Sequence, residues 1–402
     1  MKKILLLGAG YANIGLLKKI NPFVFSQAQW HLVNNTPYHY KTIALHDVAS
    51  GKHDRSVLFS IRDSIPAGVS ISEDTITHID GKAAYGKQTY EYDYLVIGLG
   101  FSSDNFGIKG VTEYTKSITS YDSAKIIAQD ILARLQSYLQ TRDKSDLAFV
   151  VCGGGFTGIE FVGSLAQEVN KKCEELGIDY NEVKIYCIEA MPKILPMFND
   201  NLMQLGLERL RDLGVEVLTS SKILECKEGA VVIEQGNEKN EVRANTIIWT
   251  AGVKGNEVIA NSTFFKSGRS KVEVNEHLQA IGQESDMSNI FIIGDCAALK
   301  DPSSGRFYPP TAQIAKKQGE YLAGILESIL QSEASGNKVD VNSLPSFSFS
   351  PEGSICSIGG GYAIGVIGNK EIKGTAANIA KWLVESAWSY RLGGLSGVFK
   401  PD

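Results

Sequence analysis

A pattern of apolar strand, glycine-rich loop and helix occurs twice in this sequence, first as "KILLLGAGYANIG" and again as "LAFVVCGGGFTGIEF". A continuous apolar run is typical of a parallel strand that is covered on both faces. The glycines favour a tight turn between that strand and the helix that follows. The repeat therefore predicts an α/β fold with two Rossmann-like dinucleotide-binding domains. They would hold two dinucleotides, or one dinucleotide beside a vestigial site.

The second glycine loop carries the complete G-x-G-x-x-G pattern, in Gly153, Gly155 and Gly158. These glycines allow the turn, the approach of a pyrophosphate and the close packing of helix on strand. The next strand, "VKIYCIEA", ends at Glu189, whose carboxylate can bind a ribose and would repel a 2′-phosphate. The loop therefore predicts an NADH site, with a ligand-free glycine turn as the alternative.

The first glycine loop departs from the pattern, because Asn13 stands where the third glycine belongs, after Gly8 and Gly10. The third glycine serves mainly helix packing, so the phosphate-facing N–H groups are expected to remain. The following strand ends in Asn34 and Asn35, and amides can bind a ribose without selecting by charge. We expect this loop to hold a dinucleotide still.

Two further acids stand at positions suited to chemistry. Asp295 ends the buried strand "NIFIIGDC", and a helix with prolines at its start begins near residue 309. The N-terminus of that helix would stabilise negative charge on a ligand, although a turn or N-cap aspartate is the common fate of Asp295. Glu160 lies two residues after Gly158 and could hold a proton, or merely favour the start of its helix.

Composition and residue spacing exclude several classes of protein. A net charge of −5 argues against nucleic-acid binding. No apolar run is long enough to span a bilayer, and the apolar stretch after "MKK" is too short for a signal peptide. The six cysteines form no C-x-x-C pair, and His39 and His46 have no second ligand at a fitting spacing. We therefore predict no metal site, buried thiols in a reducing compartment, and structural or flavin-packing histidines.

Short motifs along the chain resemble those of one family. They are, in order, "GAGYA", "PYHY", "LVIGLGF", "GGGFTGIEF", "CIEA", "LPMF", "IFIIGDC", "TAQIAKKQG" and "RLGGLSGVF". The ordered set resembles type II NADH dehydrogenases, which are single-chain NADH:quinone oxidoreductases that contain FAD, lie on the membrane surface and pump no protons. The resemblance covers essentially the whole chain.

The resemblance implies a role for each of a set of residues. The residues implied for non-covalent FAD binding are Gly8, Ala9, Gly10, Tyr11, Ala12, Asn34, Asn35, Ile76, Asp295, Ala312, Gln313 and Lys381. Those for NADH remain Gly153, Gly155, Gly158 and Glu189, and those implied for the quinone are Gln313, Ile314 and Gln318. Glu160 matches the family's active-site glutamate. Ser164 stands where the closest members carry a second acid; if that acid takes part in proton supply, the proton route here must differ.

The last segment, "GTAANIAKWLVESAWSYRLGGLSGVF", is expected to form an amphipathic helix broken at Gly393 and Gly394. Ile379, Trp382, Leu383 and Trp388 can share an apolar face, and Lys381, Glu385 and Ser389 another. On pattern alone the helix docks on the domain core or on a second copy. The resemblance favours a helix lying in the membrane interface.

The sequence thus predicts a flavoprotein that transfers a hydride from NADH to FAD and two electrons to a membrane quinone, either menaquinone or ubiquinone. The expected parts are an FAD domain at 1–108 and 265–330, an NADH domain at 109–264 and a membrane-interface region at 331–402. The expected location is the cytoplasmic face of the cell membrane, as a peripheral protein, with a homodimer left open. Alternatives are a sulfide:quinone reductase, an NADH:ferredoxin-type reductase and a flavin-free NADH-binding redox sensor.

Overall fold

The computed structural model describes residues 1–282 and 287–401. Residues 283–286, inside the predicted range 265–330, and residue 402 lie outside the described residues. The chain divides into two compact units. Unit 1 comprises residues 1–40, 59–102 and 254–350, and unit 2 comprises residues 41–58, 103–253 and 351–402.

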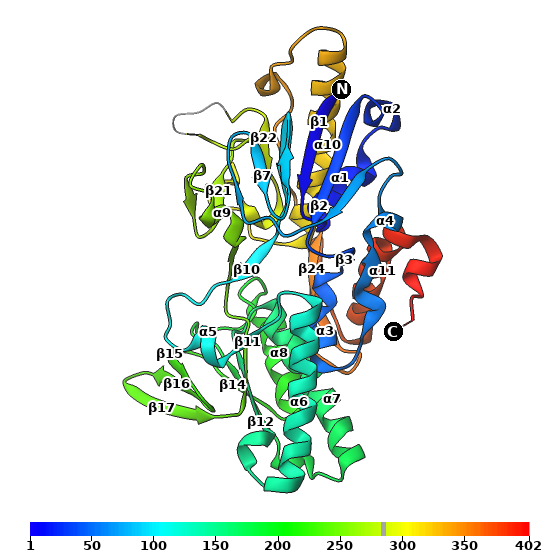
Figure 1. The fold of residues 1–402 in the computed structure, drawn as a ribbon. Helices are drawn as coiled ribbons and strands as arrows, with labels where there is room; N and C mark the ends of the chain where they lie inside the picture. Colours follow the sequence, from blue (N-terminus) through cyan, green and yellow to red (C-terminus); the bar gives the residue numbers. More distant parts are fainter. Residues whose placement is uncertain (283–286, 402) are drawn as a thin grey trace. The chain divides into compact units, whose positions relative to one another are not determined.

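Unit 1 is built on a parallel sheet with the strand order β22-β9-β1-β2-β5 (Figure 1). These strands are β1 (Lys2–Leu7), β2 (Ala28–Asn34), β5 (Ser70–Glu73), β9 (Tyr94–Ile97) and β22 (Ile290–Ile292). The last four residues of β1 are buried, as the apolar run predicted. The order places β1 at the centre of the sheet, so the first glycine loop leaves the sheet from its middle strand.

Two helices of unit 1 cross at glycines. The helix α1 (Tyr11–Lys19) follows the first glycine loop, and α10 (Ala312–Ala334) packs against it. A Cβ atom on Gly319 would lie 1.9 Å from the Ala12 carbonyl oxygen, and one on Gly15 would lie 3.0 Å from that of Lys316. The close crossing brings the start of α10 to the first glycine loop.

The remaining elements of unit 1 are short. They are α2 (Pro22–Phe25), β3 (Tyr38–Tyr40), α4 (Ile61–Ser64), β6 (His78–Ile79), β7 (Ala83–Tyr85), β8 (Thr89–Glu91), α9 (Glu257–Asn261), β20 (Ser267–Gly268), β21 (Lys271–Glu273) and β23 (Ala297–Ala298). The chain passes from one unit to the other five times. Three of these crossings lie within β4 (Leu58–Ser60), β10 (Phe101–Ser103) and β19 (Val253–Gly255), and the other two follow residues 40 and 350.

Unit 2 repeats the plan of unit 1, with a parallel sheet in the order β11-β18-β12-β13-β14. These strands are β11 (Lys116–Ser117), β12 (Ala148–Cys152), β13 (Lys184–Ile188), β14 (Val215–Leu218) and β18 (Thr246–Trp249). The helix α7 (Phe156–Leu176) follows the second glycine loop and packs with α3 (Leu45–Ser50) and α6 (Tyr121–Thr141). Parallel sheets of matching strand order in both units confirm the predicted fold class.

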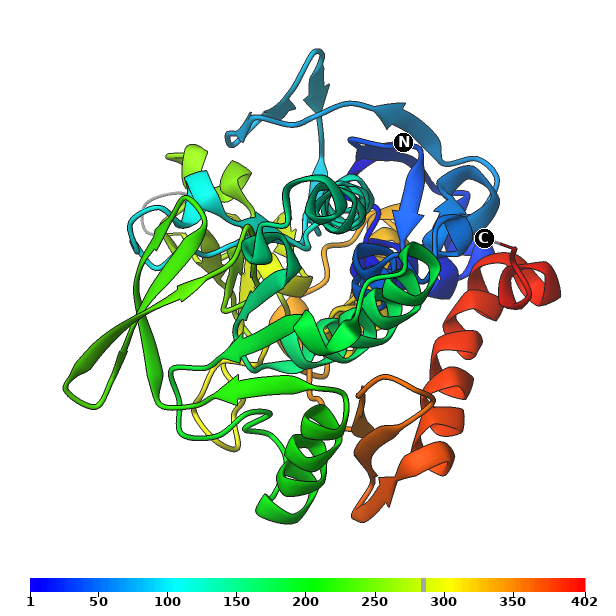
Figure 2. The ribbon, with the colours of Figure 1, turned by 90° about the horizontal axis from the view of Figure 1, so that it is seen from below.

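The rest of unit 2 consists of helices, an antiparallel sheet and the C-terminal segment. The elements are α5 (Val111–Tyr114), α8 (Asp200–Asp212), β15 (Ser221–Lys227), β16 (Ala230–Gln235) and β17 (Glu238–Arg243). The C-terminal segment holds β24 (Gly353–Ser357), β25 (Ala363–Ile367), β26 (Lys370–Lys373) and the long helix α11 (Gly374–Val398), drawn in orange and red in Figure 2. This segment packs on α7 and α8 through β24 and β25.

The C-terminal helix differs from its prediction in one respect. Gly393 and Gly394 depart from helical dihedrals, which confirms the expected break. Ile379, Trp382 and Leu383 are more than half exposed, but Trp388 is buried and cannot share their face. The prediction that grouped Trp388 with them was wrong, because the helical turn carries it to the side that packs on the protein. Among the described residues, no helix is both long and apolar enough to cross a bilayer.

Candidate active site

The first glycine loop joins β1 to α1 and is held within unit 1 by two hydrogen bonds of Ala9 and by the close packing of Gly8 on Gly98. Gly8 adopts φ +88°, where a side chain would be strained and its Cβ would lie 2.5 Å from the Gly98 carbonyl oxygen. The Ala9 N–H donates to Asn34 Oδ1 at 2.9 Å, and the Ala9 carbonyl lies 2.7 Å from His39 Nδ1. The loop is therefore fixed by the end of β2 and by the "PYHY" segment.

Asn13, the departure from the glycine pattern, is fully buried and bonded to the loop. Its Nδ2 donates to the Leu7 carbonyl at 2.9 Å and to the Gly8 carbonyl at 2.7 Å. Space for the amide exists because the neighbouring residue at the end of β9 is Gly98, where a Cβ would lie 2.8 Å from that nitrogen. Asn13 thus ties helix α1 to the strand and leaves the loop closed.

The second glycine loop in unit 2 has a matching set of contacts. The Gly154 N–H donates to Glu189 Oε2 at 2.7 Å, and the Gly154 carbonyl accepts from the Leu195 N–H at 2.9 Å. Thr250 Oγ donates to the carbonyls of Cys152 and Gly153 at 3.0 and 3.3 Å. Glu189 therefore lies against the loop, as its place at the end of the strand predicted.

Both loops present an open helix N-terminus suited to a phosphate. Gly10 and Gly155 are the N-caps of α1 and α7, and glycine supplies no side-chain acceptor for the first N–H groups. A Cβ on Gly10 would find the Gly98 oxygen at 3.8 Å, and one on Gly155 would meet no described atom within 4 Å. A pyrophosphate fits at each place, because the helix N-terminus attracts it and the glycine leaves room.

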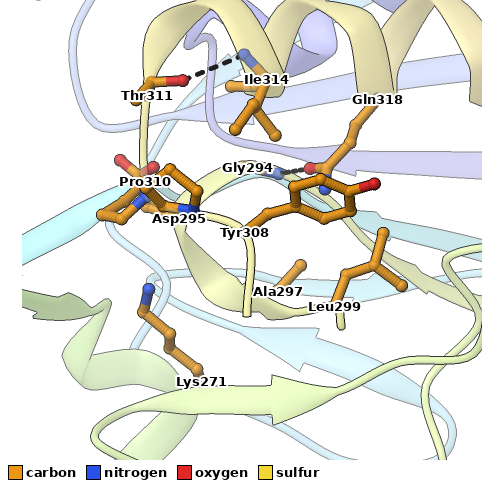
Figure 3. Close-up of a pocket in the computed structure, with 12 residues that line it drawn as sticks. Lys271, Gly294, Asp295, Ala297, Leu299, Tyr308, Pro310, Thr311, Ile314 and Gln318 are labelled. Atoms are coloured by element: carbon orange, nitrogen blue, oxygen red, sulfur yellow. Dashed lines mark hydrogen bonds between the residues drawn. The ribbon is translucent and has the colours of Figure 1, made fainter. Parts of the chain in front are cut away.

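A cavity in unit 1 surrounds Asp295, which lies in a 3-10 turn after β22 (Figure 3). Its lining includes Lys271, Asp295, Tyr308, Thr311, Ile314 and Gln318. Lys271 points its amine toward Asp295 (Figure 3). Burial raises the pKa of Asp295, which the charge of Lys271 partly offsets, and burial lowers the pKa of Lys271. A buried acid of this kind is suited to hydroxyl groups of a ligand.

The helix α10 starts at the rim of this cavity. It begins at Ala312, with Thr311 as the N-cap whose side chain accepts from the Ile314 N–H at 3.2 Å (Figure 3). Gln318 is buried and its Oε1 accepts from the Gly294 N–H at 2.7 Å. The expected start near residue 309 was three residues early, because Thr311 caps the helix after the prolines. The N-terminus of the helix lies at the cavity, which Thr311 and Ile314 line.

The residues of unit 1 fit an FAD. The glycine loop offers the pyrophosphate site, Asn34 lies beside it, and the cavity holds Asp295 and the N-terminus of α10. A Cβ on Gly294 would lie 3.6 Å from the Ala12 Cβ, so the turn of Asp295 and the first loop meet. These predicted FAD residues come together in one unit.

Glu160 is a buried acid in the second turn of α7, within unit 2. Its Oε1 accepts from Lys381 Nζ at 2.5 Å, from the Ser357 N–H at 3.1 Å and from the Ser357 hydroxyl at 3.3 Å. Its Oε2 lies 3.7 Å from His46 Nδ1. The carboxylate therefore meets α11 and β24 with one oxygen and α3 with the other.

Two more carboxylates, Glu385 and Asp47, lie near Glu160 on α11 and α3. Lys381 Nζ also pairs with Glu385 at 3.1 Å. Burial lowers the pKa of Lys381, but Glu160 and Glu385 outweigh it and the net pKa is raised. On the other side, Ser164 Oγ donates to Asp47 Oδ1 at 3.0 Å, so the carboxylate next to position 164 comes from α3. The Glu160 carboxyl thus lies in a buried cluster, in direct contact with an ammonium whose pKa is raised.

The structure leaves some predicted residues apart from these contacts. Ile76 is buried in the segment after β5, and Asn35 is exposed. Lys381, predicted for FAD, is described above in unit 2 with Glu160. Its place at FAD stays a prediction, as do the quinone roles of Gln313, Ile314 and Gln318.

Comparison with known proteins adds a family to this geometry. The model of the pyridine nucleotide-disulphide oxidoreductase family matches residues 2–319. A type II NADH:quinone oxidoreductase of Staphylococcus aureus is 33% identical, over 99% of this chain and 98% of its own length. The chain belongs to the type II NADH:quinone oxidoreductase family. This confirms the family that the motifs predicted.

Solved structures share the fold of this family member. NDH2 from Plasmodium falciparum in complex with NADH matches with a TM-score of 0.88 at 21% identity, over 99% of this chain and 98% of that one. The sulfide:quinone oxidoreductase of Aquifex aeolicus matches with a TM-score of 0.72 at 18% identity, over 98% and 93%. Likeness at such identities concerns the fold alone.

The cysteines bear on the sulfide:quinone reductase alternative. All six are free and buried. Burial raises the pKa of the Cys152 and Cys356 thiols well above the ordinary value. A thiol held neutral is a poor nucleophile, which disfavours sulfide chemistry at either residue.

Sequence reasoning missed several residues of the two sites. Thr250, Lys271 and Asp47 had no assigned role, and His46 was interpreted as structural or flavin-packing. His39 lies against the first loop, consistent with the interpretation as a structural residue. Each missed contact joins segments far apart in the chain. Only Thr250, directly after the buried strand "TIIW", carried a local signal, since strand ends line nucleotide sites.

Proposed function

We propose that this chain oxidises NADH and reduces a membrane quinone through bound FAD, without pumping protons. When bound, FAD accepts a hydride from NADH and passes two electrons to the quinone. The observation that carries the proposal is that the glycine loop occurs twice. In each unit a glycine caps the helix N-terminus, and the N–H of the second loop residue donates to a polar side chain, Asn34 in unit 1 and Glu189 in unit 2. Two such loops match an enzyme that handles two dinucleotides.

The roles follow from the two loops. The first loop and Asn34, Asp295 and Ala312 would hold FAD, with Asn35, Ile76 and Gln313 completing that site. The second loop and Glu189 would hold NADH. By ligand, we assign 1–108 and 265–330 to FAD, 109–264 to NADH and 331–402 to the membrane interface. These ranges differ from the compact units because they group residues by the ligand held.

Glu160 is the residue we assign to proton handling. Reduction of a quinone to a quinol needs two electrons and two protons, and a buried carboxylate paired with an ammonium can supply a proton. Lys381 Nζ lies 2.5 Å from Glu160 Oε1, where it can stabilise the carboxylate that remains after the proton has been given up. We place the quinone at the start of α10, near Gln313, Ile314 and Gln318, and Lys381 near the flavin.

An anaerobic visible spectrum of the purified protein tests the activity. We expect a flavin band that bleaches with NADH and returns on adding a water-soluble quinone. Loss of the band with a failure to bind added FAD would leave the flavin-free redox sensor instead. Bleaching without a return on quinone would favour a reductase with another acceptor.

The role of Glu160 has its own test. Glu160→Gln should slow reoxidation of the reduced flavin by quinone about a hundredfold, the typical contribution of general acid catalysis. Reduction of the flavin by NADH should stay within twofold in the same variant. Equal loss in both half-reactions, measured by stopped flow, would contradict the proton role.

We propose that α11 binds the cytoplasmic face of the cell membrane, as a peripheral anchor. Ile379, Trp382, Leu383 and Val384 are more than half exposed on one stretch of this helix. Exposed tryptophan and aliphatic side chains are typical of a helix in the headgroup region. An interface there would give a membrane quinone its entry.

Vesicle sedimentation tests this anchor. Deleting α11 would also remove Lys381 from Glu160, so substitution is the sharper change. Trp382→Ser with Leu383→Ser should weaken binding to anionic lipid vesicles roughly tenfold or more, given the apolar area lost. Ile126→Ser, at an equally exposed position on α6, is the matched control and should bind as before. Equal binding by all variants would refute the anchor.

A further inference from the structure

His46 lies between two carboxylates, and each of its ring nitrogens faces one of them. Nδ1 is 3.7 Å from Glu160 Oε2 on α7, and Nε2 is 3.7 Å from Asp47 Oδ2 on α3. An imidazole can take a proton at one nitrogen and release another from the second nitrogen. At 3.7 Å a single water or a small ring rotation completes each contact. The arrangement is that of a relay between two acids.

Exposure rises from His46 through Asp47 to Lys52, toward the solvent. The exposed fraction is 9% for Glu160 and 4% for His46, then 15% for Asp47 and 43% for Lys52. Lys52 Nζ donates to Asp47 Oδ1 at 3.1 Å. A proton from water can therefore approach at Asp47, whereas Glu160 and His46 are both buried.

Glu160 Oε1 is occupied by hydrogen bonds, so Oε2, which faces His46, is the oxygen available for proton exchange. Lys381 and Ser357 both bind Oε1, so the ammonium and the imidazole meet different oxygens. Burial raises the pKa of Asp47, but His46 and Lys52 outweigh it and set the value at about 2. Asp47 is therefore ionised at working pH and stabilises a positive charge on the ring.

Titratable and charged groups reach this cluster from every element around α3. Besides Glu160 and Asp47 they are Lys41, Lys52 and His53 on the flanking segments, Lys381 and Glu385 on α11, Cys356 on β24, and Tyr121 and Lys125 on α6, which bind Asp54. Three carboxylates, Asp47, Glu160 and Glu385, pair with the ammonium groups of Lys52, Lys381 and Lys41. Because these three pairs balance in charge, a proton taken up by His46 is the net positive charge that the cluster can transfer.

We propose that His46 relays protons from solvent to Glu160 during quinone reduction, with Asp47 positioning and stabilising the charged ring. This inference rests on the proposed function. NADH, one proton and the quinone give NAD⁺ and the quinol, so the hydride accounts for one hydrogen and the relay for the other. Nε2 accepts a proton from water beside Asp47, the Nδ1 proton passes to Glu160 Oε2, and no electrons move in this step.

Stopped-flow measurement of the two half-reactions across pH tests the relay. In His46→Gln, reduction of the flavin by NADH should stay within twofold. Reoxidation by a water-soluble quinone should slow about tenfold to a hundredfold, as expected for a lost proton donor path. Imidazole added to the buffer should restore much of that rate, and the slope of the rate against pH should change. Asp47→Asn should slow reoxidation by a smaller factor, roughly threefold to tenfold.

The control is His31→Gln, a half-buried histidine of unit 1 that binds Ser72, which should leave both half-reactions unchanged. Wild-type reoxidation rates in His46→Gln would overturn the relay. A slowed rate without imidazole rescue or a changed pH profile would overturn it too, because that points to packing. If His46→Gln does not fold, Asp47→Asn decides by the two half-reaction rates and the pH profile of reoxidation, since imidazole rescue applies only where the histidine is removed. A wild-type flavin that no quinone reoxidises would instead refute the proposed function, and the relay with it.

Discussion

The two glycine loops make the same contacts with different residues. In both, the N–H of the second loop residue binds the side chain that ends the next strand, Asn34 in unit 1 and Glu189 in unit 2. In both, the carbonyl of the second loop residue accepts a hydrogen bond. The Ala9 carbonyl accepts from His39 in unit 1, and the Gly154 carbonyl accepts from the Leu195 N–H in unit 2. The loops are equivalent in geometry although their sequences differ.

The contacts at the third glycine position show why Asn13 can replace glycine in the first loop. In unit 2 a Cβ on Gly158 would lie 1.9 Å from the Gly153 oxygen and 2.8 Å from Thr250 Oγ. In unit 1 the side chain comes from the helix, as Asn13, and the strand end is the glycine, Gly98. One side-chain donor binds the strand-end and first-glycine carbonyls in each loop. The third loop position and the strand-end position opposite it are therefore constrained together: one supplies the side-chain donor and the other is glycine, as Asn13 with Gly98 and as Thr250 with Gly158.

Placing an asparagine in the second loop should have the largest effect. Gly158→Asn should abolish NADH binding and lower the free energy of unfolding by about 3 kcal/mol or more, because the clash involves backbone. Adding Thr250→Gly should recover part of the loss. NADH titration and denaturant unfolding measure both, and flavin content is the internal control. A single variant that binds NADH normally would break the comparison.

Acid should distinguish the loops next, because only the first uses a histidine. Burial lowers the pKa of His39 from 6.5 to about 4, although its bond to Ala9 raises it. The unfolded chain then binds more protons than the folded chain between these values, so stability falls as the pH falls from 6.5 toward 4. The loss from this residue should reach about 3 kcal/mol near pH 4.

Comparison with His39→Gln isolates the contribution of His39 titration to the pH dependence of stability. The difference in unfolding free energy between wild type and variant should shrink as the pH falls through that window. Urea unfolding at several pH values measures it. A difference that stays constant from pH 7 to pH 4 would show that His39 does not titrate as expected.

Removing the donor from the first loop should have a smaller effect. Asn13→Ala leaves the carbonyls of Leu7 and Gly8 without this buried donor and should cost about 2 kcal/mol. Weaker retention of FAD on dilution should accompany the loss. The double variant Asn13→Gly with Gly98→Thr transplants the arrangement of the second loop and should recover about half of it. Recovery by Asn13→Gly alone would contradict the paired constraint.

The smallest effect is expected at the strand ends. Glu189→Gln keeps an acceptor for the Gly154 N–H and should change stability by less than about 1 kcal/mol. The preference for NADH over NADPH should fall about tenfold, since the repulsion of a 2′-phosphate is lost. Glu216→Gln, an exposed acid on the neighbouring strand β14, is the control for a change of net charge. Kinetics with both nucleotides measure the ratio.

Local patterns predicted the framework of both sites. Apolar runs gave the central strands β1 and β12, and the glycines and Glu189 followed from spacing. Asn13 was recognised as a departure, but its two bonds depend on Gly98, a residue on another strand. A sequence period reports contacts within an element and not those between distant segments, so such compensation stays hidden.

The surroundings of Glu160 were the least predictable part. Its place on a helix after the second loop was clear, whereas His46, Ser357 and Lys381 come from three segments separated from it by more than a hundred residues. The resemblance to a family supplied a role for Lys381 but none for His46. Long-range packing decides these contacts, and it leaves no mark in composition or spacing.

Because the neighbours of Glu160 come from both ends of the chain, the site has a consequence for biosynthesis. During synthesis, the second glycine loop leaves the ribosome long before α11, whose Lys381 neutralises Glu160. The closing contacts join residues far apart and form late, since long loops must close first. A chain that stalls before α11 is made would keep a nucleotide loop but lack the ion pair at Glu160. The acid–base centre therefore forms only after the C-terminal helix has been synthesised.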